Sequence, residues 1–117
     1  MFKVLSEGSV TSPQGFRASG MRAGIKKSVR KFDVSLIYSE TPATGAGTFT
    51  TSQIKAWPLQ HDLRMIRNRT HQVIFANSGN ANCFNGESGK EALSVSLRML
   101  SRALRVPKER ILLASTG

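Results

Sequence analysis

Four leucines near the end of the chain recur at intervals of three or four residues: Leu93, Leu97, Leu100 and Leu104. This spacing places them on one face of a helix, which predicts a helix from about Glu91 to Arg105 with a buried leucine stripe. Ser88 and Glu91 match a capping box, so we expect the helix to begin near Ser88. Pro107 cannot continue the helix, because proline lacks a backbone N–H and its ring clashes with the preceding turn.

Two short apolar segments flank the predicted helix. Residues 72–76 read Gln-Val-Ile-Phe-Ala and residues 111–114 read Ile-Leu-Leu-Ala, so we expect both to be buried strands. A strand, a helix and a second strand form a βαβ-like unit whose strands can pair in parallel. The expected fold class is therefore α/β, with α+β as the alternative, built on a mixed sheet with a packed helix.

The first half of the chain has weaker patterns. Residues 32–38 alternate and then become apolar, which predicts a strand. Residues 8–24 contain four glycines and a proline, which favours turns and short extended pieces over a regular element. After a stretch of small residues, residues 48–51 are predicted to be a second strand. Residues 53–60 could extend it, with Pro58 at a sheet edge or end.

Cysteine and histidine usage excludes two classes of small domain. Cys83 is the single cysteine and cannot form an intrachain disulfide, which agrees with a reducing compartment. Together with His61 and His71 it does not match the spacing of a zinc site, so no metal is expected. We interpret Cys83 as a small, partly buried residue and both histidines as polar groups of loops or strand edges.

Targeting signals are weak. The sequence has no stretch of roughly 18 to 20 apolar residues that could span a membrane, and its start lacks the apolar run of a secretory signal. An Arg- and Ser-rich stretch follows, but Gly8, Pro13 and Gly15 would break an amphipathic targeting helix. We therefore expect a cytoplasmic protein with no membrane partner.

The charge is strongly positive, with 17 Lys and Arg against 7 Asp and Glu and a net charge of +10. Nucleic acid is the first partner to consider for such a chain. The basic residues nevertheless fall in three separated groups without the aromatic side chains on which bases stack. We expect no nucleic-acid partner and keep a small basic nucleic-acid-binding module as an alternative. An acidic remainder of a larger protein would balance the charge.

An asparagine-rich segment, residues 77–82, follows the first of the two buried strands. Asparagine and glycine tolerate left-handed backbone angles, so a structural turn explains the composition. Carboxamides at a strand end also offer donors and acceptors to a polar substrate or an oxyanion. From composition alone the structural interpretation is favoured.

Four segments, in order and in rough spacing, resemble the ornithine acetyltransferase family of arginine biosynthesis. They are residues 10–18 with 23–26, residues 42–51, residues 77–82 with Gly86, Glu87 and Gly89, and residues 114–117. The resemblance covers nearly the whole chain from Gly8 onward. Phe84 stands where a smaller residue is expected.

The resemblance implies that residues 1–117 are a single partial domain, the N-terminal portion of a self-processing acetyltransferase with a threonine nucleophile. The family moves an acetyl group from N-acetylornithine to glutamate, and bifunctional members also use acetyl-CoA. No cofactor is expected apart from acetyl-CoA as a substrate. The precursor cuts itself at an Ala-Thr bond, and the freed threonine carries the acetyl group.

That Ala-Thr bond lies beyond Gly117 in the family's order, so the chain alone is expected to be inactive. Its expected partners are the remaining C-terminal part of the same precursor and further copies in a higher oligomer of processed chains. A last strand with nothing to cover it also suggests the opening portion of a larger fold.

The resemblance also implies site residues. Thr116 and Gly117 correspond to the Thr-Gly pair that forms the family's oxyanion hole. Asn77, Asn80 and Asn82 are expected to bind substrate or to shape the site. A threonine-nucleophile aminopeptidase of similar fold is a further alternative, because a fold does not fix a substrate.

Overall fold

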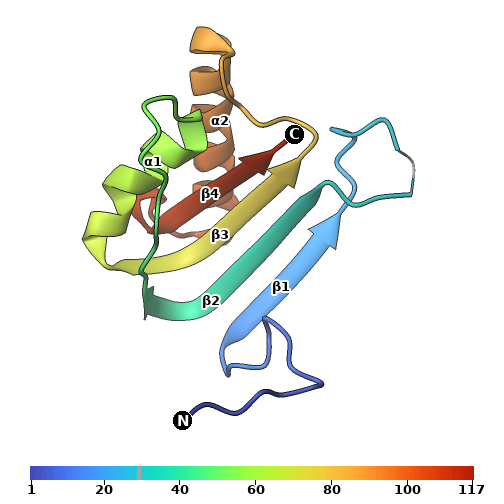
Figure 1. Cartoon of the computed structure of the whole chain (residues 1–117), viewed down its shortest axis with the longest axis vertical. Helices are drawn as coiled ribbons and strands as arrows, with labels where there is room; N and C mark the ends of the chain where they lie inside the picture. Colours follow the sequence, from blue (N-terminus) through green and yellow to red (C-terminus); the bar gives the residue numbers. More distant parts are fainter. Residues whose placement is uncertain (29) are drawn as a thin grey trace.

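The computed structural model describes residues 1–28 and 30–117, which form one four-stranded sheet with two α-helices beside it (Figure 1). The strand order is β1-β2-β3-β4. The strands are β1 (Phe16–Met21), β2 (Val34–Thr44), β3 (Thr70–Ser78) and β4 (Ile111–Thr116). The first three pair in an antiparallel manner, whereas β3 and β4 pair in parallel.

The parallel pair is joined by the longer helix, α2 (Gly86–Leu104). The predicted strand–helix–strand unit and the mixed sheet are therefore confirmed. The core confirms the leucine stripe as well, because Leu97 is buried against Val73, Ile111 and Leu113. The other three leucines of the stripe are half-buried against the same cluster. After α2, Arg105 is left-handed and a 3₁₀ turn, η2 (Lys108–Arg110), leads into β4.

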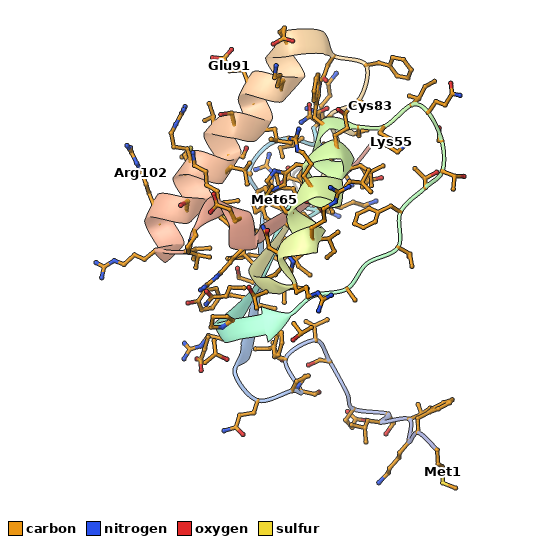
Figure 2. All side chains as sticks on the ribbon, turned by 90° about the vertical axis from the view of Figure 1, so that its left-hand side faces the viewer. Met1, Lys55, Met65, Cys83, Glu91 and Arg102 are labelled. Atoms are coloured by element: carbon orange, nitrogen blue, oxygen red, sulfur yellow. The ribbon has the colours of Figure 1, made fainter. Side chains whose placement is uncertain are left out.

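The predicted capping box is wrong. The helix begins at Gly86, and the Ser88 hydroxyl donates to the carbonyl of Asn85 at 2.7 Å, so it does not accept a backbone N–H as a cap would. Glu91 lies one turn into the helix and is exposed on its outer face, as is Arg102 (Figure 2). The helix starts earlier than the Ser88 and Glu91 pattern suggests because the preceding asparagine loop contacts its first turn, where Asn82 Nδ2 donates to the carbonyl of Gly89.

Two predictions for the first half of the chain are also wrong. Residues 8–24, predicted as turns and short extended pieces without a regular element, contain β1, whose pairing with β2 supplies the regular structure that its mostly exposed side chains do not signal. Residues 48–60 do not form a strand. Residues 45–56 are irregular, and α1 (Trp57–Met65) follows, with Pro58 in its first turn, where the missing N–H costs nothing.

The predicted strand at residues 32–38 exists as β2, but β2 runs further than expected. It continues through Pro42 to Thr44, with an irregular register between Tyr38 and Ala43. Beyond α1, a 3₁₀ turn, η1 (Ile66–Asn68), leads to β3.

One face of the sheet is covered by α2, and the opposite face carries no charged side chain along its paired strands. We call this the open face. It includes Phe16, Ala18, Gly20, Ser35, Ile37, Ser39, Ile74, Ala76, Ser78, Leu112, Ala114 and Thr116. Ile74 is 44% exposed there. In the part of the chain that the structure describes, no helix is long and apolar enough to cross a membrane.

Candidate functional site

The ends of β3 and β4 meet at one edge of the sheet, because the two strands are parallel. Asn77 lies opposite Ser115, and Ser78 lies opposite Thr116. In open sheets, ligands bind outside the carboxyl ends of parallel strands. A cavity of about 190 Å³ opens at this end, between the strand ends and α2. Its lining includes Asn77, Asn80, Asn82 and Ser115. We call it the asparagine cavity.

Asn77 links the two strand ends. Its Oδ1 accepts the Ser115 hydroxyl at 2.5 Å, and its Nδ2 donates to the carbonyl of Asn80 at 2.9 Å. Both ends of the amide are therefore engaged within the chain. Asn77 thereby holds the end of β4 in place relative to the loop after β3, which is a site-shaping role.

Asn82 is the anchor of that loop. It is 9% exposed and left-handed, with φ of 50°. Its Nδ2 donates to the carbonyl of Gly89 at 3.2 Å, and its Oδ1 accepts the Asn85 amide at 2.6 Å. Its own carbonyl accepts the backbone N–H of Trp57 at 3.1 Å. Asn82 therefore joins the loop to both helices.

Asn80 differs from the other two asparagines because it is exposed. Its Oδ1 accepts the backbone N–H of Asn82 at 2.9 Å, which holds the loop closed. The neighbouring Cys83 is half-buried beside the start of α1, as predicted for a small, partly buried residue (Figure 2).

Thr116 and Gly117 lie at the same strand end but are not part of the asparagine cavity. Side chains alternate along a strand, so Thr116 points to the open face whereas Ser115 points to the α2 side. Thr116 lines a separate hollow of about 200 Å³ together with Phe32, Asp33 and Asn77. Gly117 follows the last residue of β4 and is exposed.

Two titratable side chains, to which the sequence assigned no role at the site, contact the outer edge of β4, the edge that is not paired with β3. The ring Nε2 of His61 is 3.0 Å from the carbonyl oxygen of Ile111. The Asp62 carboxylate accepts the backbone N–H of Leu113 at 2.9 and 3.2 Å. Backbone groups also alternate along a strand, so the N–H of Ser115 is directed to this same outer edge. A cavity of about 360 Å³ follows the edge past Asp62 and Ser115.

Burial dominates the electrostatics of this edge. It raises the pKa of Asp62 to about 7, although the N–H of Leu113 acts in the opposite direction. Burial likewise lowers the pKa of His61, which favours its neutral form.

The interpretation of both histidines as loop or strand-edge groups is wrong. His61 is buried in α1, and His71 is buried in β3, an inner strand of the sheet. The signal for α1 was the spacing of Leu59, Leu63 and Ile66 behind Pro58, which fits a helix entered through proline. Among the described residues, no group of three His, Cys, Asp or Glu side chains could hold a metal ion.

The comparisons with known proteins agree on one family. The model of the ArgJ family matches residues 17–117. The chain is 41% identical over 112 residues to the arginine biosynthesis bifunctional protein ArgJ of Gloeobacter violaceus, covering 95% of the chain and 27% of that protein. It is 40% identical over 112 residues to the glutamate N-acetyltransferase of Methanocaldococcus jannaschii, covering 95% and 26%. The chain therefore spans only about a quarter of the length of these relatives.

Solved structures share the fold. The arginine biosynthesis bifunctional protein ArgJ of Bacillus halodurans matches with a TM-score of 0.90 and 31% identity, over 97% of this chain and 59% of that one. The ornithine acetyltransferase of Mycobacterium tuberculosis, complexed with ornithine, matches with a TM-score of 0.89 and 31% identity, over 97% and 61%. These matches confirm the expected α/β class and the resemblance seen in the sequence.

Proposed function

The chain belongs to the ArgJ family, and from this membership we propose that it is the N-terminal part of a cytoplasmic acetyltransferase of arginine biosynthesis. The enzyme moves an acetyl group from N-acetylornithine to glutamate, and acetyl-CoA serves as a second donor. The observation that carries the proposal is the family match over residues 17–117, which includes all of the site residues. The similarity to a glutamate N-acetyltransferase and to an ornithine acetyltransferase supports the same reaction.

The remaining C-terminal part of the same precursor is the proposed partner of this chain, and it supplies the threonine nucleophile. The apolar character of the open face supports the presence of such a partner. Phe16, Ile37, Ile74 and Leu112 are apolar and lie together on it. Covering apolar surface contributes about 25 cal/mol per Å². A further layer of protein on the open face is therefore favourable, and we propose that processed chains assemble into a higher oligomer.

In the proposed reaction, the hydroxyl of the nucleophilic threonine attacks the acetyl carbonyl of N-acetylornithine. The carbonyl oxygen becomes negative, the C–N bond then breaks, and the hydroxyl proton goes to the departing amine. In the second half-reaction, glutamate's amine attacks the resulting threonine ester, the bond between the acetyl carbon and the threonine oxygen breaks, and a proton of the amine returns to that oxygen, which restores the hydroxyl. Both steps pass through a tetrahedral oxyanion, which needs donors that already point at it.

We assign these donors to the Thr116 hydroxyl and the Gly117 N–H. Gly117 has no side chain, so a substrate can approach its backbone closely. If the strand alternation continues, the Gly117 N–H faces the outer edge of β4, away from β3. The hydrogen bond between Ser115 and Asn77 holds this strand end in place. Asn80 and Asn82 shape the neighbouring asparagine cavity, which would take part of the substrate.

The test uses the complete precursor that contains this chain, incubated with N-acetylornithine and glutamate. We expect ornithine and N-acetylglutamate to form in equal amounts. A sample that is incubated with N-acetylornithine alone and then denatured should contain the fragment that begins with the nucleophilic threonine, heavier by one acetyl group. A folded, processed protein that transfers no acetyl group to glutamate would contradict the proposal, and release of free amino acids from peptides would favour the aminopeptidase instead.

A further inference from the structure

The connection between β1 and β2 is the most basic segment of the chain near the candidate site. We call residues 22–33 the basic loop, of which the structure describes residues 22–28 and 30–33. Its cations are Arg22, Lys26, Lys27, Arg30 and Lys31. The loop leaves the sheet at the end where Val34 lies opposite Asn77. Figure 1 shows it at the same end as the loop after β3 and the C-terminus.

Asp33 is the only acidic residue of the basic loop. Its carboxylate accepts hydrogen bonds from the loop's own backbone and, in the part of the loop that the structure describes, does not pair with the loop's cations. The carboxylate is 2% exposed and accepts the N–H groups of Ala23 at 2.6 Å and Lys26 at 3.0 Å. These hydrogen bonds lower the pKa of Asp33, so it remains ionised. Asp33 thereby holds the loop in one conformation, because a single carboxylate binds N–H groups three residues apart.

Among the residues that the structure describes, no ion pair joins a side-chain charge of the basic loop to an acid. Within the described residues, the ion pairs join Arg17 to Glu40 and Lys90 to Glu87, and neither involves the loop. Several like charges within one short loop repel one another. An anion bound at the loop would relieve this repulsion.

The basic loop lies against the loop that borders the asparagine cavity. Ile25 is one of the residues that line this cavity. A Cβ atom at Gly79 would lie 2.8 Å from Lys26 Cγ and 3.1 Å from Ile25 Cγ2. Gly79 also has φ of 96°, which disfavours any other residue there. The missing side chain at Gly79 therefore lets the Lys26 stem pack against the loop that carries Asn77 and Asn80, two residues that line the cavity.

We propose that the basic loop binds the anionic part of the substrate, with Lys26 as the cation nearest the asparagine cavity. This inference rests on the proposed function and names the substrate chemistry recognised at that site. Each substrate of the proposed reaction carries an anionic group: N-acetylornithine is a zwitterion with one carboxylate, glutamate has two carboxylates, and acetyl-CoA carries phosphates. A lysine ammonium is a compact point charge that can bind either group. Its contribution is to substrate binding, and the bond-making step does not require it.

Lys26→Gln in the complete precursor tests this inference. The variant keeps the backbone N–H that binds Asp33 and much of the stem that packs on Gly79, so the loop should retain its conformation. We expect KM for the recognised substrate to rise about tenfold, in line with the loss of one hydrogen bond to a charged group. We expect kcat to change by less than about twofold, since uniform binding is what is lost. Lys108→Gln is the matched control, because Lys108 lies in η2, before the opposite end of β4.

Separate KM values identify the recognised group. A rise for N-acetylornithine or glutamate alone assigns the loop to a carboxylate, and a rise for acetyl-CoA alone assigns it to phosphate. Either result supports anion binding. An unchanged KM for all three substrates in a folded, active variant overturns the inference while leaving the proposed function intact. An inactive wild-type protein would instead contradict the proposed function.

A salt titration of the wild-type protein provides a measurement that needs no variant. Salt screens charge–charge attraction, so KM for the recognised substrate should rise with ionic strength while kcat stays nearly constant. Should Lys26→Gln fail to fold, this titration decides the matter. A KM independent of ionic strength would overturn the inference.

Discussion

Asp62 accepts the backbone N–H of Leu113 through both carboxylate oxygens, at 2.9 and 3.2 Å. A side chain of α1 thus occupies the position on the edge of β4 that a further strand would otherwise take. The cost of removing the carboxylate from water exceeds the gain from this hydrogen bond, because the pKa of Asp62 rises to about 7. The edge of β4 is therefore held by a group that changes its charge near neutral pH.

The first prediction concerns the pH dependence of stability. The pKa of Asp62 rises from an ordinary value of 3.8 to about 7 on folding, so the folded state binds this proton more tightly. Its contribution to the free energy of unfolding is full below about pH 4 and is lost as the pH rises through 7. Asp62→Asn keeps an acceptor oxygen for Leu113 but does not ionise. We expect the variant to exceed the wild type in stability at pH 8, by on the order of 1 kcal/mol after allowance for partial exposure.

Urea unfolding followed by the fluorescence of Trp57, the single tryptophan of the chain, measures this difference. The lowered pKa values of His61 and His71 reduce stability as the pH falls below 6.5, in wild type and variant alike. The comparison between the two proteins therefore isolates Asp62. Parallel pH profiles for wild type and Asp62→Asn would show that the carboxylate titrates normally.

The second prediction concerns the oxyanion donors. Thr116→Ala in the complete precursor should lower the rate of acetyl transfer by roughly 10²-fold or more, the usual effect of losing one such donor. The fold of this chain should be unchanged because Thr116 is the last residue of β4 and its side chain lies outside the buried core. Thr70→Ala, at the opposite end of β3, is the control and should keep its activity. Unchanged turnover in Thr116→Ala would exclude its hydroxyl from the oxyanion hole.

The third prediction concerns the core. Leu97 is 6% exposed and contacts the buried residues of β3 and β4, so Leu97→Ala should cost about 2 to 5 kcal/mol of unfolding free energy. Met99→Ala in the same helix removes a side chain that is 66% exposed and serves as the control. Denaturation of both variants gives the comparison. A loss below about 0.5 kcal/mol for Leu97→Ala, the size of an ordinary surface change, would mean that α2 does not pack as described.

The fourth prediction concerns Gly45, whose missing side chain leaves room for the ring of His71. A Cβ atom at position 45 would lie 2.2 Å from His71 Cδ2, and the buried His71 ring has little room to move. Gly45→Ala should therefore destabilise the fold by about 1 to 3 kcal/mol, the usual cost of overpacking. In a His71→Ala background the same change should cost much less, because the clash is gone. Additive effects in this double-mutant cycle would show that the two positions do not interact.

The sequence was sufficient for the parts of the fold that depend on local periodicity. The spacing of Leu93 to Leu104 and the two apolar runs beside it predicted α2, β3 and β4 and their parallel pairing. In contrast, β1 is defined by its pairing with β2 and has almost no burial pattern of its own. Pro58 is compatible both with a strand edge and with the first turn of a helix, and the sequence pattern was interpreted the wrong way.

The residues of the candidate site also fall into those that the sequence could identify and those that it could not. Asn77, Asn80 and Asn82 were identifiable because asparagines after a buried strand are characteristic of a loop at a strand end, and all three line one cavity. The roles of His61 and Asp62 were not identifiable. They depend on contacts with β4, about fifty residues later in the chain.

The agreement between strand order and chain order has a consequence for how the protein is made. Each strand pairs with the strand synthesised just before it, so the sheet can grow in the order in which the ribosome releases the chain. The closure of each connection costs little entropy, because no early strand waits for a distant one. The exception is α1, which emerges before the strand whose edge it protects. Until Leu113 has been synthesised, the half-buried carboxylate of Asp62 lacks the backbone N–H that it accepts in the native fold, so α1 can take its native position on this edge only once β4 is complete.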